Sequence, residues 1–274
     1  HLGPAARIGC ASYARGLYCQ KIKRMRCLLI RLSLFLALTA PMGAAAQESC
    51  CALPGTGAQA RFAALAEAPG FAAQHLEPLP FRLQNPRGQM VRFAAGGREA
   101  QAYLLKSSAA TQKWVFVFHE WWGLNDYVRA QAERLQAGLG GAVNVLALDM
   151  YDGAAAATRE EAAKLMQALS PARSQEIFTG ALAYAGPQAE VGTLGWCMGG
   201  GLSMQAALAA GAQARACVIY YGMPEMDAQR LAGLAAPVLF HVPVQDKWIT
   251  PEISRAFAQK MNEAKKHLVV SYYE

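Results

Sequence analysis

Residues 191–201 read Val-Gly-Thr-Leu-Gly-Trp-Cys-Met-Gly-Gly-Gly, and this segment sets the architecture that we predict for the rest of the chain. Its apolar start, Val191–Leu194, predicts a short buried strand, and a helix is predicted from Met198 to Ala210. A sharp strand-to-helix turn crowds the backbone, so glycines two positions before and after the turn residue relieve clashes. The order of residues therefore predicts a nucleophile elbow. Cys197 would lie at the helix N-terminus, where the helix dipole favours a thiolate.

The pattern around this segment is an alternation of apolar strands and amphipathic helices. A Gly-Gly pair at 96–97 predicts a hairpin between residues 90–93 and 100–105. Further strands are predicted at 114–118, 143–148, 191–194, 216–221, 238–242 and 268–273, and helices at 125–137, 158–169, 170–185, 198–210, 227–234 and 250–266. Fully apolar strands separated by helices predict an α/β fold whose mostly parallel sheet carries helices on both faces. In such sheets, sites form beyond the carboxyl ends of the strands.

The composition excludes several classes of protein. Apolar residues make up 54% of the 274 residues and charged residues 16%, so the chain can bury a core and is not intrinsically disordered. The formal net charge of +7 comes from seven basic side chains within residues 1–46, which hold no acidic residue; the rest of the chain has 19 basic and 19 acidic residues. A nucleic-acid partner is therefore not expected.

The first 46 residues have the pattern of a secretory signal peptide. A basic region at Lys21–Arg26 precedes a short apolar core at Leu32–Ala40, and Ala44–Ala46 supplies small residues for cleavage. The sequence thus predicts export to the periplasm or the medium, with no stable membrane span after cleavage. An uncleaved membrane anchor is the alternative. Residues 47–87 are rich in Ala, Gly and Pro and are predicted to form a loosely structured arm with one short helix at 61–68.

The seven cysteines have no Cys-x-x-Cys or Cys/His spacing that indicates zinc. We therefore expect no metal site, and no cofactor. Cys50 and Cys51 lie in the arm, and their redox state is left open.

Two carboxylates follow predicted strands directly. Glu120 comes after the strand at 114–118, and Asp246 comes soon after the strand at 238–242, where the acid of a hydrolase triad is expected. The alternatives are a surface carboxylate capping a loop for Glu120, a turn cap for Asp246 and a buried structural thiol for Cys197.

Five blocks in order resemble the dienelactone hydrolase family, an α/β-hydrolase branch with a Cys nucleophile. They are His-Glu-Trp-Trp-Gly-Leu-Asn at 119–125, Leu-Asp-Met-Tyr-Asp-Gly at 148–153, Gly-Trp-Cys-Met-Gly-Gly at 195–200, Tyr-Tyr-Gly at 220–222 and Gln-Asp-Lys-Trp-Ile-Thr-Pro-Glu at 245–252. The resemblance covers residues 88–274. It implies an α/β-hydrolase domain over this range and cleavage of a small ester or lactone.

The resemblance also implies a role for each site residue. Cys197 would attack the carbonyl carbon, Asp246 would orient a proton-relaying His, and Glu120 would bond the resting thiol. The backbone N–H groups of Trp121 and Met198 would form the oxyanion hole, which stabilises the developing alkoxide. Trp122 and Trp248 would line the substrate pocket.

Two features depart from the family pattern. The family's triad His follows the last strand, where this sequence has only Glu274. We therefore expect a domain that is incomplete at its C-terminal end, and impaired activity. His75, His119, His241 and His267 are not expected to substitute for that His. Family members that act on anionic lactones also have an Arg soon after the strand ending near Asp149; the next Arg here is Arg159, which favours an uncharged substrate.

Two other functions remain open from the sequence. One is an exported thiol-redox protein, in which Cys197 would become oxidised and Cys217 or Cys51 would then form a disulfide with it. A non-catalytic binding protein would use an aromatic pocket around Trp121, Trp122 and Trp248.

Overall fold

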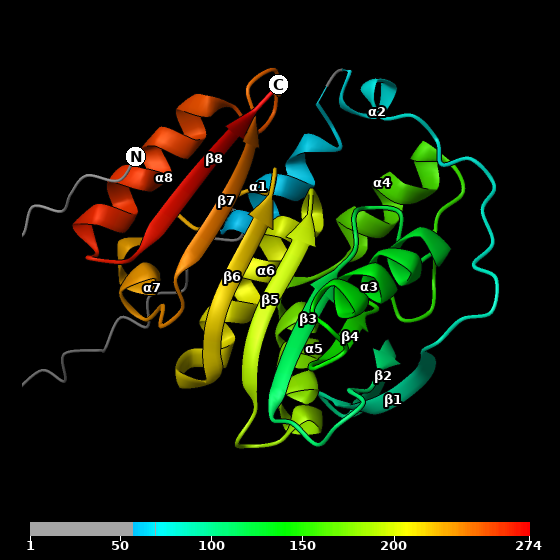
Figure 1. Ribbon diagram of the computed structural model, residues 1–274. Coiled ribbons are helices and arrows are strands. Elements are labelled where there is room, and N and C mark those ends of the chain that lie inside the picture. The colour runs from blue at the N-terminus through cyan, green and yellow to red at the C-terminus, as the bar shows by residue number, and fades with distance from the viewer. Residues whose placement is uncertain (1–56, 69) are drawn as a thin grey trace, which may run out of the picture. The chain divides into compact units, whose positions relative to one another are not determined.

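The computed structural model describes residues 57–68 and 70–274 (Figure 1). In this part, eight strands form one sheet in the order β1-β2-β4-β3-β5-β6-β7-β8. The first three strands in this order pair antiparallel, β1 with β2 and β2 with β4, and all other neighbours are parallel. The strands are β1 Gln89–Ala95, β2 Arg98–Leu105, β3 Lys113–Phe118, β4 Asn144–Leu148, β5 Glu190–Trp196, β6 Ala214–Tyr220, β7 Val238–Pro243 and β8 Leu268–Tyr273.

Helices follow most strands, and their starts match local sequence signals. Asn125 caps α3 by accepting from the Val128 N–H, and Thr158 and Glu161 form a capping box at α4. The helices are α1 Ala58–Leu65, α2 Phe71–Gln74, α3 Asp126–Gly138, α4 Arg159–Ala168, α5 Pro171–Ala185, α6 Met198–Ala210, the 3₁₀ turn η1 Gly211–Gln213, α7 Ala228–Ala232 and α8 Pro251–Glu263. The predicted mostly parallel α/β sheet with helices on both faces is thus confirmed.

The two faces of the sheet are covered unequally. Helix α3 packs on β2 and β4, while α5 and α6 pack together on the opposite face (Figure 1). Side chains alternate between the faces, so in β3 Phe116 and Phe118 join the larger core and Val117 joins the smaller one. Strand β4 is buried at every residue, whereas β7 alternates between buried and half-buried residues. Helix α3 covers its face of the sheet only around β2 and β4.

The segment before the sheet is more ordered than the loose arm that we expected. Helix α1 begins three residues earlier than predicted, and α2 was not predicted. Phe62 and Phe71 are buried in the main core because apolar side chains of both helices face it. The Arg61 side chain donates to the Pro224 carbonyl at 3.0 Å, which ties α1 to the loop after β6.

Some predictions concern residues that the structure does not describe. The signal peptide within residues 1–46, the arm residues 47–56, and Cys50 and Cys51 lie outside the described ranges. Within those ranges, no helix has the length and apolar character needed to cross a membrane.

Candidate active site

The turn between β5 and α6 has a strained backbone at one residue. Cys197 has φ 56° and ψ −121°, a conformation that L-residues with a side chain rarely adopt. Its N–H donates to the Tyr220 carbonyl at 2.9 Å, which fixes the turn against the end of β6. A bend of this kind lifts the Cys197 side chain above the carboxyl ends of the strands, as the elbow pattern predicts.

Two glycines allow the elbow to pack closely. A Cβ atom on Gly199 would lie 2.4 Å from the carbonyl oxygens of Phe118 and His119, at the end of β3. A Cβ atom on Gly195 would lie 2.0 Å from the Gly199 carbonyl oxygen. Neither position accepts a side chain, so the glycines bring the start of α6 against β3, where Glu120 lies.

The thiol of Cys197 lies in a buried, negatively charged environment. The residue is only 6% exposed. Burial, and after it the carboxylates of Glu120 and Asp246, raise the pKa of Cys197 well above its usual range; the Met198 N–H, which bonds the sulfur, partly offsets this. The charges of Glu120 and Asp246 therefore both act on Cys197, as expected if the three side chains lie near one another. The resting thiol carries its proton.

Glu120 is largely removed from solvent beyond the end of β3. Tyr221 Oη donates to Glu120 Oε1 at 3.1 Å. Burial raises the pKa of Glu120, while the Tyr221 hydrogen bond and the nearby His75 act in the opposite direction. The expected hydrogen bond between Glu120 and the resting thiol is not found among the described contacts; the Tyr221 hydroxyl bonds the carboxylate instead.

Asp246 lies in the loop between β7 and α8. Its Oδ1 accepts from the N–H groups of Trp248 at 2.7 Å and Ile249 at 2.9 Å. Asp246 thus caps its own turn, which was the alternative to a triad role. Its charge also helps to raise the pKa of Cys197. Next to it, β8 ends at Tyr273, whose pKa is raised by burial and by Asp246. Within residues 57–68 and 70–274, no imidazole hydrogen-bonds to Asp246.

His119 has its own partners, as expected of a side chain that points away from the nucleophile. The ring is fully buried, its Nδ1–H donates to the Glu120 carbonyl at 2.5 Å, and its Nε2 accepts from the Met150 N–H at 3.1 Å. This arrangement requires a neutral ring, and burial lowers its pKa. His241 stacks on Tyr220 at 4.4 Å within the sheet, and His267 is exposed before β8.

The two N–H groups assigned to the oxyanion hole are available. In the described part of the chain, neither the Trp121 N–H nor the Met198 N–H donates to a backbone carbonyl, and the Met198 N–H points at the sulfur. The Trp121 indole is completely buried, with the rings of Phe71 and His75 at centroid distances of 5.3 and 5.0 Å. Packing of the indole ring therefore restricts the position of the Trp121 backbone.

A cavity of about 440 Å³ adjoins this cluster. Its walls are mostly aromatic and apolar, and no lining residue is a Lys or Arg; the lining residues are Leu76, Pro78, Glu120, Trp122, Asn125, Tyr127, Val128, Gln131, Trp196 and Tyr221. Trp122 is one of the residues that line this cavity. Trp248 does not line this cavity, because its ring packs on Phe71 at 5.4 Å. Cys197 itself is not among the lining residues, whereas Glu120, whose charge acts on the Cys197 thiol, is one of them.

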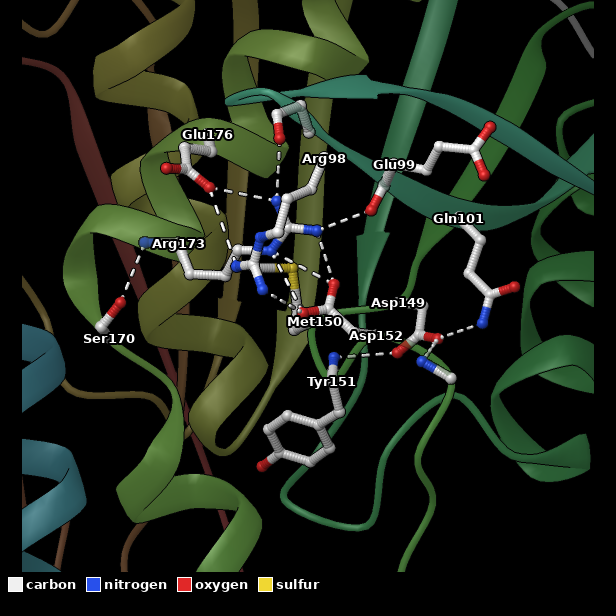
Figure 2. Close-up of polar contacts among 12 residues, drawn as sticks. Arg98, Glu99, Gln101, Asp149, Met150, Tyr151, Asp152, Ser170, Arg173 and Glu176 are labelled. Atoms are coloured by element: carbon white, nitrogen blue, oxygen red, sulfur yellow. Dashed lines mark hydrogen bonds and ion pairs between the residues drawn. The ribbon is translucent and has the colours of Figure 1, made fainter.

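The loop after β4 supports the elbow from another side. The carboxylate of Asp149 accepts from the N–H groups of Tyr151 and Gly153, which folds the loop tightly. Tyr151 points away from the charged groups of the loop (Figure 2), and its Oη donates to Met198 Sδ at 3.2 Å. The loop therefore contacts Met198, whose N–H is assigned to the oxyanion hole.

A buried guanidinium anchors this loop. The Arg173 side chain is 7% exposed and lies between the carboxylates of Asp152 and Glu176 (Figure 2). It also donates to the carbonyls of Ala95 at 3.0 Å and Glu99 at 2.8 Å. All its donors point at protein acceptors, so Arg173 has a structural role and does not replace the carboxylate-binding Arg that the loop lacks.

Three residues that contact the site were not identified from the sequence. Tyr221 directly follows β6, so the search for polar residues after strands could have found it. Tyr151 lies three residues beyond the end of β4, within a block already noted. His75 had no such signal, because it lies far from the strand ends in the sequence and only folding brings it to Trp121.

The comparisons with known proteins identify the family of the chain. The sequence profile of the dienelactone hydrolase family matches residues 100–274. A curated protein of Aquifex aeolicus (strain VF5) named "Putative carboxymethylenebutenolidase" is 29% identical over 175 residues, 59% of this chain and 73% of that protein. Protein usf of Aquifex pyrophilus is 28% identical over 187 residues, 64% of this chain and 78% of that protein.

Solved structures share the fold. The crystal structure of a dienelactone hydrolase-like promiscuous phosphotriesterase from metagenomic libraries matches with a TM-score of 0.59 and 23% identity, over 68% of this chain and 82% of that one. Such a likeness concerns the arrangement of strands and helices.

Proposed function

The chain belongs to the dienelactone hydrolase family, and we propose that it cleaves a small, uncharged ester or lactone through an acyl-enzyme on Cys197. The observation that carries the proposal is the strained elbow. It holds a protonated thiol beside a carboxylate with a raised pKa, Glu120, and beside two N–H groups that lack backbone acceptors. Strain at a single residue next to a pocket is typical of a functional site.

The first step needs a proton acceptor for the thiol. A carboxylate whose pKa is raised by burial is a stronger base than an exposed one, and it accepts a proton only while it is ionised. We assign this role to Glu120, with Tyr221 Oη steadying the carboxylate. As the Cys197 sulfur bonds to the carbonyl carbon, its proton moves to Glu120 and the carbonyl π electrons move to the oxygen.

The N–H groups of Trp121 and Met198 then stabilise the negative oxygen. Removal of one such donor typically costs about 10²–10³ in rate. When the carbonyl re-forms, the bond to the alcohol oxygen breaks and the alkoxide takes the proton back from Glu120. The products are a thioester on Cys197 and a free alcohol; a lactone gives a single molecule still attached to the sulfur.

Release of the acyl group requires an activated water. The family role of Asp246 is to orient a His for this step, and the described residues present no imidazole to Asp246. We therefore propose that this chain acylates faster than it deacylates and is impaired in turnover, so the thioester accumulates. A burst of alcohol release followed by a slow steady state would support this, and steady turnover without a burst would contradict it.

The substrate is proposed to be uncharged because of the charges at the cavity. Glu120 is the ionisable carboxylate in the lining, and no lining side chain is a cation. A carboxylate-bearing lactone would approach this negative group without a compensating Arg, which is unfavourable. Faster acylation by the free acid of a lactone than by its methyl ester would refute this assignment.

Mass spectrometry after mixing the protein with p-nitrophenyl acetate tests the main proposal. An acetyl group on Cys197 is expected. Oxidation of Cys197 to a disulfide without acylation would favour the redox alternative. Within the described residues, Cys197 and Cys217 are both free thiols. Ligand binding that persists in Cys197→Ala, with no acylation of the wild type, would favour the binding protein.

We also propose export, on the sequence of residues 21–46. Expression of the full chain in a bacterium and separation of periplasm from cytoplasm tests this. A mature N-terminus at Gln47 is expected, and a cytoplasmic protein with its first 46 residues intact would contradict the proposal.

A further inference from the structure

Residues 71–78 lie against the part of the site formed by Glu120 and Trp121. Phe71 is 1% exposed, and its carbonyl oxygen lies 2.7 Å from His75 Nδ1. The rings of Phe71 and His75 pack with a centroid distance of 4.4 Å. The imidazole is therefore fixed in position by a hydrogen bond to the segment's own backbone and by a buried aromatic ring.

This fixed imidazole contacts the site. Its ring centroid lies 5.0 Å from that of the Trp121 indole. The residues that follow it, Leu76 and Pro78, line the same cavity as Glu120. The segment is thus one wall of the proposed catalytic cavity, although it precedes the first strand of the sheet in the sequence.

The titratable groups around Glu120 come from three parts of the fold. Tyr221 after β6 donates a hydrogen bond, the Cys197 thiol lies at the start of α6, and His75 lies in the N-terminal segment, where its ring packs on Trp121, the residue next to Glu120. Burial raises the pKa of Glu120, and His75 acts against it. Of the three groups, only an imidazole can become a cation, and a nearby cation favours the ionised form of a carboxylate.

We propose that His75 is a positioning residue of the hydrolase site, which holds Glu120 as a carboxylate beside Cys197 and fixes the Trp121 backbone that supplies an oxyanion-hole N–H. This proposal rests on the proposed function. His75 acts through its neighbours and touches neither the sulfur nor Asp246: the charged groups that act on the thiol are Glu120 and Asp246. Its Nδ1–H is already donated to the Phe71 carbonyl.

Two variants separate the possible roles of the ring. His75→Phe keeps the aromatic contacts with Phe71 and Trp121 and loses the hydrogen bond and the group that can become a cation. His75→Asn keeps a donor near the Nδ1 position and loses the ring and the group that can become a cation. If the charge is what matters, acylation of Cys197 by p-nitrophenyl acetate slows about tenfold in both variants, equivalent to about 1.4 kcal/mol, while half-saturation by the ester is unchanged.

His267→Asn is the matched control, because His267 is exposed before β8, and its acylation rate should stay within about twofold of the wild type. Wild-type acylation in His75→Phe would mean that the ring only packs, and wild-type acylation in His75→Asn would mean that only the hydrogen bond matters. Either result overturns the proposal. A double variant with Glu120→Gln provides a second test: the His75→Phe substitution should then slow acylation less than twofold, because its target is gone.

An infrared titration makes the test independent of catalysis. The protonated-carboxyl band that disappears in Glu120→Gln belongs to Glu120. In His75→Phe its midpoint should move to higher pH, because the group that lowers the pKa of Glu120 is lost. An unchanged midpoint overturns the role of His75 whether or not the protein acylates. Absence of acylation together with a shifted midpoint would instead reject the proposed function and leave the electrostatic interaction between His75 and Glu120 established.

Discussion

Cys197 and Cys217 are both buried free thiols beside the same helix, and their surroundings differ in kind. Cys217 lies within β6, in regular parallel pairing with Thr193 of β5 and Val238 of β7. Cys197 directly follows β5 and has a backbone conformation with positive φ. The first position could hold any small apolar residue, whereas the second imposes strain that the rest of the fold has to support.

The neighbours of the two sulfurs differ as well. Burial raises the pKa of Cys217 to about 11, and hydrogen bonds from the hydroxyls of Thr193 and Ser203 moderate the effect. The pKa of Cys197 is raised by burial and further by two carboxylates. Burial and a raised pKa therefore do not by themselves mark a nucleophile. Backbone strain, carboxylates and free N–H groups at one sulfur only are the distinguishing features.

The largest effect is expected on the rate of ester cleavage when the Cys197 sulfur is removed. Cys197→Ala should slow release of p-nitrophenol by at least about 10³-fold, because the attacking atom is gone. Cys217→Ala should stay within about threefold, since its sulfur contacts only the hydroxyls and apolar groups of the core. Similar losses in both variants would show that the structural contrast between the two sites has no functional meaning.

The next effect concerns the backbone of the elbow. Gly199→Ala should lower the free energy of unfolding by about 3 kcal/mol or more, because the new Cβ would lie 2.4 Å from two carbonyl oxygens. Gly192→Ala, in the same strand-and-turn unit, is the control: its Cβ would meet nothing closer than 3.8 Å. Urea unfolding measures both, and equal stability of the two variants would contradict close packing of the elbow on β3.

A smaller effect is expected from replacing Glu120, whose carboxylate acts on Cys197 and not on Cys217. Glu120→Gln should slow acylation at neutral pH about 10²-fold, because the proton acceptor is lost. The same change removes a negative charge that raises the pKa of Cys197, so alkylation by iodoacetamide should begin at lower pH. Alkylation of Cys217 should keep its pH dependence. Unchanged acylation together with the alkylation shift would exclude Glu120 as the acceptor.

The smallest effect is expected at the other sulfur. Ser203 Oγ lies 3.0 Å from the Val218 carbonyl oxygen and 3.7 Å from Cys217 Sγ. Ser203→Ala should cost about 1–2 kcal/mol of stability by leaving a buried carbonyl without this donor, and acylation of Cys197 should not change. A change in acylation would show that the two surroundings are coupled through α6.

Much of the fold could be predicted because strands and helices here have strong local signals. The helix at Met198–Ala210 and the strand at Leu268–Tyr273 have the predicted bounds, and the capping box at Thr158 is present. Which strands α3 covers could not be predicted from local signals. An apolar strand residue such as Leu239 has the same local pattern whether or not a helix packs over it, because cover depends on where distant helices lie.

The candidate site was predictable where its residues directly follow strands, as Cys197 and Glu120 do. Parallel strands deliver such residues to one edge of the sheet. Trp248 was assigned to the pocket as a nearby aromatic, yet its ring packs on Phe71. That contact comes from a helix that the sequence did not predict, so the place of Trp248 depended on an interaction between distant segments.

The sequence by itself determined the order of the elements and the sharp turn at Cys197, because glycine spacing and apolar runs act over a few residues. Only the tertiary structure decided which groups surround the sulfur. It placed Tyr221 on Glu120, directed the Asp246 carboxylate to the amides of its own turn, and brought His75 to Trp121. The physical reason is that burial, charge and hydrogen bonding depend on distance in space, which residue spacing along the chain does not encode.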